Sequence, residues 1–147
     1  MKIQDAFKEL LKDHFAPMMR KLGFKGSGQK YSYPADDYFI QIGIQKSQYS
    51  DSERISFTLN IQIIGKEEWN EVRKTRDFYP EKPSANTFYG VGKNERIGLM
   101  TPQNLDKWWD YGLDAKELSI LDEIRVMIET YVLPEIAMKV TTEPNQA

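Results

Sequence analysis

The sequence predicts an α+β fold, with an antiparallel meander sheet of about four to five strands packed on one face by N-terminal and C-terminal helices. Two stretches between Tyr38 and Ile64 alternate apolar and polar residues, as strands do when they bury one face. Apolar residues at spacings of three and four mark a helix at each end of the chain. Because the strands lie between these helices in sequence, we expect both helices to cover the apolar face of one sheet.

The first helix is expected over Ile3–Leu22, where charged residues separate the apolar ones. Pro17 has no amide proton and its ring clashes with the preceding turn, so we expect a kink or a restart near Ala16. Gly23 is expected to end the helix, since glycine accepts the left-handed conformation that follows a helix C-terminus. Phe24 would then fold back over the last turn in a Schellman arrangement.

The strands are expected after a Gly/Ser-rich loop at Lys25–Gln29. A short strand at Gln29–Tyr33 precedes a turn at Pro34, whose ring presets φ. The central antiparallel pair follows, and its strands are joined by a polar connection, Ser47–Glu53, that is longer than a tight hairpin needs. The alternating apolar residues of this pair are Ile40, Ile42, Ile44, Ile55, Phe57, Leu59, Ile61 and Ile63.

The pattern is weaker after Gly65. Two helical turns at Glu67–Lys74 would direct Trp69 and Val72 inward. The other elements expected here are an irregular segment at Asp77–Ala85, a second hairpin made of Thr87–Val91 and Arg96–Met100, and a helical turn at Asn104–Asp110 that carries Trp108 and Trp109.

The last helix has the clearest start. Asp114 is expected as its N-cap, with Glu117 completing a capping box and Leu113 and Leu118 in the staple positions. Pro134 is expected to end or bend this helix. Its apolar stripe is Leu118, Leu121, Ile124, Ile128 and Tyr131.

The composition excludes several classes of protein. We expect residues 1–140 to form one domain and residues 141–147 a frayed tail. The net charge of −2 gives no global attraction to nucleic acid, and a chain without cysteine excludes disulfides, thiolate nucleophiles and Cys-ligated metals. Charges interrupt the N-terminal residues and no apolar run approaches the roughly 18 residues of a membrane helix. A cytoplasmic protein without membrane contact is therefore expected.

The polar face of the central pair is the expected location of functional side chains. It carries uncharged hydrogen-bonding groups where a merely solvated face usually carries Lys and Glu. Three interpretations are open: an ordinary exposed face with cross-strand Thr and Gln pairs, a surface that recognises a polar ligand or partner, or a cleft made by residues 66–100 folding over this face. The residues of this face are Phe39, Gln41, Gly43, Gln45, Ser56, Thr58, Asn60 and Gln62.

Other residues that carry chemistry are sparse. His14 is the sole histidine, which excludes His-paired catalysis, and its place at the edge of a helical stripe favours a structural role. The paired acids are neighbours in sequence and point in different directions, so they form no general acid/base pair. Adjacent Trp108 and Trp109 also point apart, which makes one of them an interface candidate. We expect no catalytic residue, no metal and no cofactor.

Several short motifs occur in a characteristic order. They are Gly23-Phe24, Gln45-Lys46-Ser47, Phe57–Asn60, Arg96-Ile97-Gly98, Asp106–Trp109 and Leu133-Pro134. In this order, and over nearly the whole chain, they resemble the bacterial family catalogued as domain of unknown function 4304 (DUF4304). The resemblance implies no established activity, cofactor or catalytic residue. It implies that five residues sit together for structural or binding reasons: Gln45, Ser47, Asn60, Arg96 and Trp109.

The leading hypothesis is a non-enzymatic module that binds another protein, as immunity proteins and antitoxins do, a comparison that rests on size and sparse chemistry. The alternative is a small-ligand-binding protein or enzyme with a polar cleft at Gln45, Ser47, Asn60 and Arg96, where an arginine fork would match carboxylate or phosphate. Nucleic-acid binding is the least favoured, and the sequence predicts no oligomeric state. The basic residues considered for it are Arg20, Lys21, Lys25 and Lys30, which equally fit a solvated helix end. The residues expected to contact a ligand or partner are Gln41, Gln45, Ser47, Asn60, Arg96 and Trp109.

Overall fold

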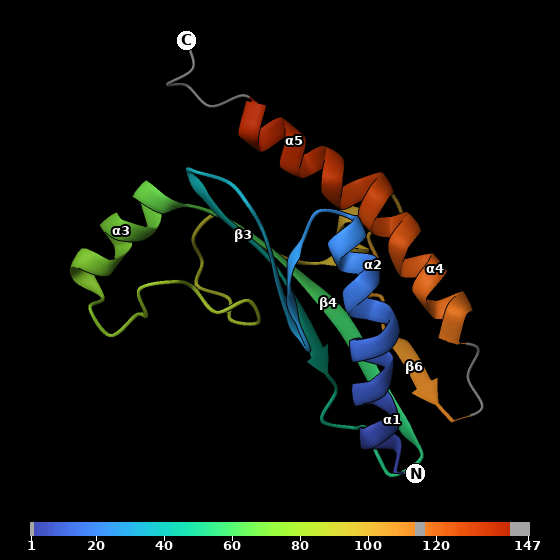
Figure 1. Cartoon of the computed structure of the whole chain (residues 1–147). Coiled ribbons are helices and arrows are strands. Elements are labelled where there is room, and N and C mark those ends of the chain that lie inside the picture. The colour runs from blue at the N-terminus through green and yellow to red at the C-terminus, as the bar shows by residue number, and fades with distance from the viewer. Residues whose placement is uncertain (1, 114–116, 142–147) are drawn as a thin grey trace.

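A computed structural model of the chain describes residues 2–113 and 117–141 (Figure 1). The helices are α1 (Ile3–Leu10), α2 (Ala16–Lys21), α3 (Lys66–Thr75), α4 (Glu117–Met127) and α5 (Leu133–Thr141). The strands are β1 (Lys25–Ser27), β2 (Lys30–Tyr33), β3 (Tyr38–Lys46), β4 (Arg54–Gly65), β5 (Lys93–Arg96) and β6 (Trp109–Gly112). Two π-helical turns (Leu11–Phe15 and Ile128–Val132) and a 3₁₀ helix (Ile97–Met100) complete the regular structure of these residues.

The strands form one antiparallel sheet in the order β1-β2-β3-β4-β5, and β6 also pairs with β4. β4 is long enough for β5 and β6 to lie one after the other along its side away from β3. In the central pair Ile42 lies opposite Ile61, and Gln41 lies opposite Gln62. The apolar residues therefore share one face and the polar residues the other, as their alternation predicts. The expected α+β meander is confirmed, with six strands where four to five were expected.

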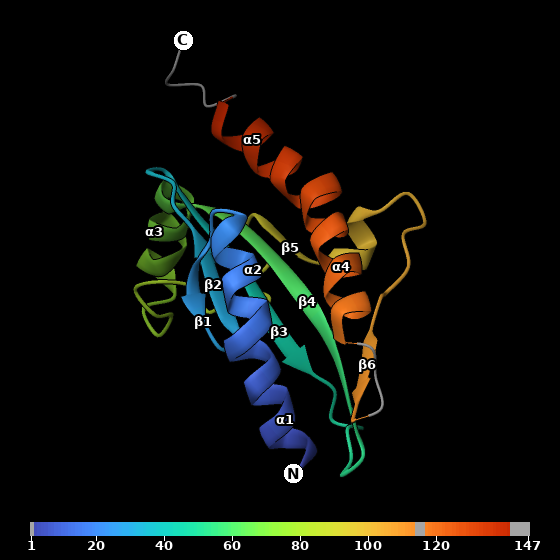
Figure 2. The same ribbon diagram turned by 45° about the vertical axis from the view of Figure 1, so that its right-hand side comes forward.

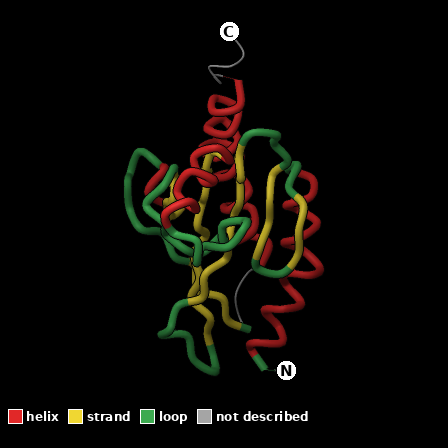
Figure 3. Tube along the Cα trace, turned by 90° about the vertical axis from the view of Figure 1, so that its left-hand side faces the viewer, coloured by secondary structure: helices red, strands yellow, loops and turns green. Residues whose placement is uncertain are grey.

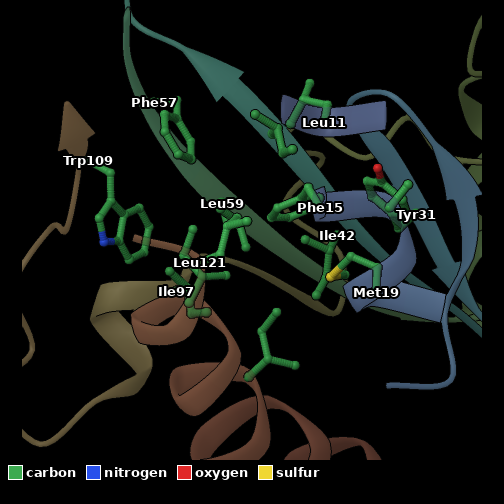
Figure 4. Close-up of a cluster of buried hydrophobic side chains, with 14 of the residues drawn as sticks. Leu11, Phe15, Met19, Tyr31, Ile42, Phe57, Leu59, Ile97, Trp109 and Leu121 are labelled. Carbon is green, nitrogen blue, oxygen red and sulfur yellow. The ribbon is translucent and has the colours of Figure 1, made fainter. Parts of the chain in front are cut away.

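The apolar face of the sheet packs against both helical layers. Figure 2 shows α1–α2 and α4–α5 in front of the strands. In Figure 4, Phe15 and Met19 from the first layer and Leu121 from the second lie around Ile42 and Leu59 of the sheet. All five side chains are buried in one core cluster, so the two ends of the chain are held to the same face.

The opposite face is covered by α3 and by residues 76–92, which we call the cover segment and which include the irregular stretch expected at Asp77–Ala85 (Figure 3). Trp69 of α3 is fully buried and stacks on Tyr79 with ring centroids 5.4 Å apart. Tyr89 meets the same indole edge-on at 4.7 Å, and the indole N–H donates to the Glu81 carbonyl at 3.1 Å. The cover segment contains no helix or strand, and this aromatic cluster joins it to α3 together with the hydrogen bonds from Trp69 and from Arg73, which donates to the Tyr79 carbonyl at 3.4 Å.

The end of the first helical layer is confirmed. Gly23 has φ +102°, and its amide donates to the Arg20 carbonyl at 3.1 Å. The Phe24 amide donates to the Met19 carbonyl at 3.0 Å, and both of these side chains are buried. These two bonds are those of a Schellman motif.

Each of the two helical layers accommodates a proline through a π-helical turn. The Ala16 amide donates to the Leu11 carbonyl just before Pro17, and the Leu133 amide donates to the Ile128 carbonyl just before Pro134. Each of these bonds spans five residues, which widens the helix where the proline ring would otherwise clash with the preceding turn. The expected restart at Ala16 is confirmed. Pro134 does not end its helix, because the π turn lets α5 continue to Thr141.

Three local expectations are wrong, and in each case sheet pairing overrides the local pattern. The Gly/Ser-rich loop contains β1, which pairs with β2 as an edge strand. The second hairpin does not form, because β5 pairs with β4, residues 97–100 form a 3₁₀ helix, and residues 87–91 belong to the cover segment. The helical turn expected at Asn104–Asp110 is absent, since Trp109 and Asp110 pair with β4 as part of β6.

The start of the last helix is only partly described. The expected N-cap, Asp114, lies outside the described residues, as do residues 142–147 of the expected tail. Leu118 is 70% exposed, so it does not belong to the buried stripe, whereas Leu121, Ile124 and Ile128 are buried as expected. No helix within the described ranges has both the length and the apolar character needed to cross a bilayer.

Candidate functional site

The polar face of the central strands lies under the cover segment. Gln41, Asn60 and Gln62 are at most 6% exposed. The Gln41 amide nitrogen donates to Gln62 Oε1 and to the Pro83 carbonyl, both at 2.7 Å, and the Gln62 amide nitrogen donates to the Ser84 carbonyl at 2.9 Å. Gln41, which was expected to contact a ligand, therefore holds the chain's own backbone in place together with Gln62.

The same arrangement continues along the face at Asn60. Its amide nitrogen donates to Gln45 Oε1 at 2.8 Å and to Asn86 Oδ1 at 2.9 Å. The Asn86 amide nitrogen then donates to the Ile44 carbonyl at 3.1 Å. A Cβ atom on Gly43 would overlap Asn86 Oδ1, so the cover segment sits directly on the strand. Of the three interpretations, the one in which residues 66–100 fold over this face is correct. Asn86 fills the space at Gly43, and a pocket of about 430 Å³ remains beside Gln41, between residues 82–85 and β2.

Arg96 lies beside Asn60, its partner in the ladder between β4 and β5. Its guanidinium donates to Asp106 Oδ2 at 2.6 Å and stands 5.0 Å from the ring centre of Trp108. Arg96 Nε and Asn60 Oδ1 are buried and have no hydrogen-bond partner among the described residues.

Two of the predicted site residues lie elsewhere. Ser47 lies beyond the end of β3, where its hydroxyl oxygen accepts a hydrogen bond from the Tyr49 amide at 3.0 Å. Trp109 pairs with Phe57 in the sheet and is 4% exposed in the apolar core, with the two rings 5.9 Å apart. The structure thus brings Gln45, Asn60 and Arg96 together on the polar face. Trp109 is on the opposite face, because its β6 position places its side chain toward the helices.

Among the described residues outside the polar face, few side chains are placed to catalyse a reaction or to bind a metal ion. His14 is exposed on the first π-helical turn rather than held within the core. Across the part of the chain that the structure describes, no group of three or more His, Asp or Glu side chains is placed to hold a metal ion.

A groove of about 590 Å³ lies between residues 98–107 and the side of α4 that leads into the second π-helical turn. Leu105 on one wall is 67% exposed, and Val126 on the other is 50% exposed. Met127 and Tyr131, both half-buried, also line it. We call this the Leu105 groove, and its walls combine apolar side chains with a charged rim.

Ion pairs hold the segment that carries Leu105 against both β5 and α4. Asp106 is paired with Arg96, and Lys107 Nζ lies 3.0 Å from Glu123 Oε1 of α4. The Lys107 carbonyl accepts a hydrogen bond from Thr58 Oγ1 at 2.6 Å. These contacts fix the backbone that presents Leu105 to solvent. No pattern in the sequence points to this groove, because its two walls are separated in sequence and meet only in the folded chain.

Comparison with known protein families assigns the chain to a family. A family model described as a domain of unknown function, DUF4304, matches residues 15–137. The chain belongs to the DUF4304 family. The comparisons with curated proteins and with solved structures each found no match.

The matched residues of this DUF4304 domain contain every strand described above, the cover segment and both walls of the Leu105 groove. The family match therefore extends to the features from which a function can be argued. Helix α1 precedes the match.

Proposed function

We propose that this DUF4304 protein is a non-enzymatic protein-binding module whose partner docks in the Leu105 groove. The observation that supports it is the exposure of Leu105 and Val126 across one concave surface. Exposed apolar side chains that gather in one place and are surrounded by polar groups are typical of protein interaction sites.

The charged rim of the groove favours a partner that places an apolar side chain in the centre of the groove. Lys107 is paired with Glu123 at 3.0 Å, and Arg125 lies 3.6 Å from Asp122. Because the rim cations and carboxylates neutralise one another, the groove has little net charge with which to attract an ionic ligand. An apolar anchor inserted between Leu105 and the α4 wall would be shielded from water by this rim.

The alternative of a polar cleft receives less support. Gln45 and Asn60 are hydrogen-bonded to each other, and the guanidinium of Arg96 is engaged by Asp106 and Trp108. A ligand carboxylate or phosphate would have to displace the Asp106 carboxylate to reach the arginine fork.

The test uses two exposed leucines with similar accessibility. Tagged wild-type protein and its Leu105→Glu and Leu118→Glu variants are purified from the native host, and co-purifying proteins are quantified by mass spectrometry. Leu118 is 70% exposed on α4 and does not line the groove, so it is the matched control. A stoichiometric partner should be retained by wild type and by Leu118→Glu and lost from Leu105→Glu. Recovery of the same partner by all three proteins would show that it does not dock here.

We propose more specifically that the protein acts as an immunity protein or antitoxin, which neutralises a toxic partner. The recovered partner is expressed alone in a test host and then together with wild type or Leu105→Glu. We expect growth inhibition by the partner, relief by wild type, and no relief by Leu105→Glu. A partner that is harmless when expressed alone would contradict the immunity or antitoxin role. It would not contradict the protein-binding function.

A further inference from the structure

A second groove, of about 760 Å³, lies between the first helical layer and the turn that joins β1 to β2. Its walls include Leu11 and Ala16, which are buried, and the exposed Gly28 at the tip of the turn. An added Cβ at Gly28 would meet no atom within 4 Å, so the tip of the turn is unobstructed. The groove is therefore floored by buried helix side chains, and its exposed lining is polar or charged.

Cations dominate the lining of this groove. Lys8, Lys12, Arg20 and Lys30 line it, against the single carboxylate of Asp13. None of these four cations forms an ion pair with a carboxylate of residues 2–113 or 117–141. The concentration of positive charge is local, because the whole chain carries a net charge of −2.

A hydrogen bond to β1 positions the side chain of Arg20. Its guanidinium donates to the Gly26 carbonyl of β1 at 3.1 Å, which orients the side chain and leaves its charge uncompensated. An anion in the groove would therefore meet one pre-oriented guanidinium, and it would meet lysines from both walls.

The lack of exposed rings among the described lining residues distinguishes between two kinds of anion. Single-stranded nucleic acid is held by exposed aromatic rings on which bases stack. The nearby rings of Phe15 and Tyr31 are buried against each other, 5.4 Å apart, and no aromatic side chain of the described residues lines the groove. An acidic peptide offers carboxylates for the cations and needs no aromatic surface on which to stack.

We propose that this groove binds an acidic peptide segment of a partner protein. Its carboxylates lie against Lys8 and Lys12 on α1 and the π turn, and against Lys30 at the start of β2. This site is separate from the Leu105 groove and does not depend on it.

The test measures fluorescence anisotropy of a short labelled peptide that alternates Glu and Leu, at low ionic strength where surface charges are least screened. Lys12→Glu and Lys30→Glu each reverse a charge in one wall of the groove. Lys21→Glu makes the same change at an exposed helix position outside the lining. The two groove variants should each weaken binding about tenfold, and Lys21→Glu should leave it within about twofold of wild type.

These measurements distinguish a peptide-binding groove from non-specific attraction to charge and from nucleic-acid binding. An equal loss in Lys21→Glu and the groove variants shows attraction to net charge alone and overturns the site. No binding of the peptide by wild type also overturns it. A single-stranded oligonucleotide of equal net charge is measured in parallel, and tighter binding of the oligonucleotide would assign the groove to nucleic acid instead. Because the two groove lysines lie on different walls, a failure of one variant to fold leaves the other to decide.

Discussion

Asn60 of β4 donates a hydrogen bond of 2.9 Å to Asn86 of the cover segment, 26 residues further along the chain. The acceptor belongs to a segment with no helix or strand, and the donor is 1% exposed. The polar face of the sheet is therefore an internal surface whose amide side chains replace the backbone ladder that the cover segment lacks.

The Asn86→Ala variant is expected to lose this bond and the bond from its own amide to the Ile44 carbonyl. Because the Asn60 amide and the Ile44 carbonyl would stay buried, the free energy of unfolding should fall by about 1–3 kcal/mol in urea titrations. Asn70→Ala, at an exposed position of α3, is the control and should change it by no more than roughly 0.5 kcal/mol. Equal stability of the two variants would show that the cover segment is held by other contacts.

Gly43→Ala tests how closely the cover segment approaches the sheet. The new Cβ would overlap Asn86 Oδ1 and lie 3.0 Å from the Ala85 Cβ, so the segment must shift, at a cost of about 1–3 kcal/mol. Gly65→Ala is the comparison, since its Cβ would make only ordinary contacts of 3.8 and 3.9 Å. Thermal unfolding should show the larger loss for Gly43→Ala, and the reverse order would contradict the close approach.

Gly98→Ala tests the wall of the Leu105 groove. A Cβ at Gly98 would overlap the Leu105 carbonyl oxygen and lie 2.7 Å from the Lys107 nitrogen. Both are backbone atoms that cannot rotate away, so the segment carrying Leu105 must move. We expect a lower thermal midpoint and weaker partner retention than for Gly65→Ala. Unchanged retention in a stable Gly98→Ala protein would show that the position of this segment does not matter for binding.

Tyr31 predicts a loss of stability at alkaline pH. Burial raises the pKa of its phenol to about 12 from the ordinary 10.0, and the charge of Arg20 opposes this only in part. Between these two values the unfolded chain has released the phenolic proton and the folded chain retains it. The free energy of unfolding therefore falls as pH rises from about 10 toward about 12.

The Tyr31→Phe variant should remove this part of the pH dependence. The hydroxyl is buried and has no hydrogen-bond partner among the described residues, so its removal is expected to cause no loss of stability at neutral pH. Urea titrations of wild type and variant at about pH 8 and about pH 11 give the comparison. Tyr49→Phe, at a side chain that is 83% exposed, should follow wild type at both pH values. Parallel behaviour of Tyr31→Phe and wild type would contradict the raised pKa.

Local patterns in the sequence were enough to predict the central strand pair, the first helix and its end at Gly23, and α3 with Trp69 inward. Each depends on contacts within one element or on a backbone preference of a single residue. The resemblance to DUF4304 was also correct, since a fixed order of motifs is a property of the sequence alone. Local patterns failed at β6, where the long strand β4 had room for another partner and the stretch around Trp109 had no strong preference of its own.

That Gln41, Asn60 and Gln62 share one face of the sheet follows from the sequence pattern, because side chains alternate along a strand. The pattern does not predict what covers that face. An amide side chain is satisfied equally by water, by a ligand or by the chain's own backbone, and its pairing with residues 76–92 depends on contacts between segments that meet only in the folded chain. The Leu105 groove is of the same kind: an exposed leucine becomes part of a binding surface only when folding places Val126 opposite it.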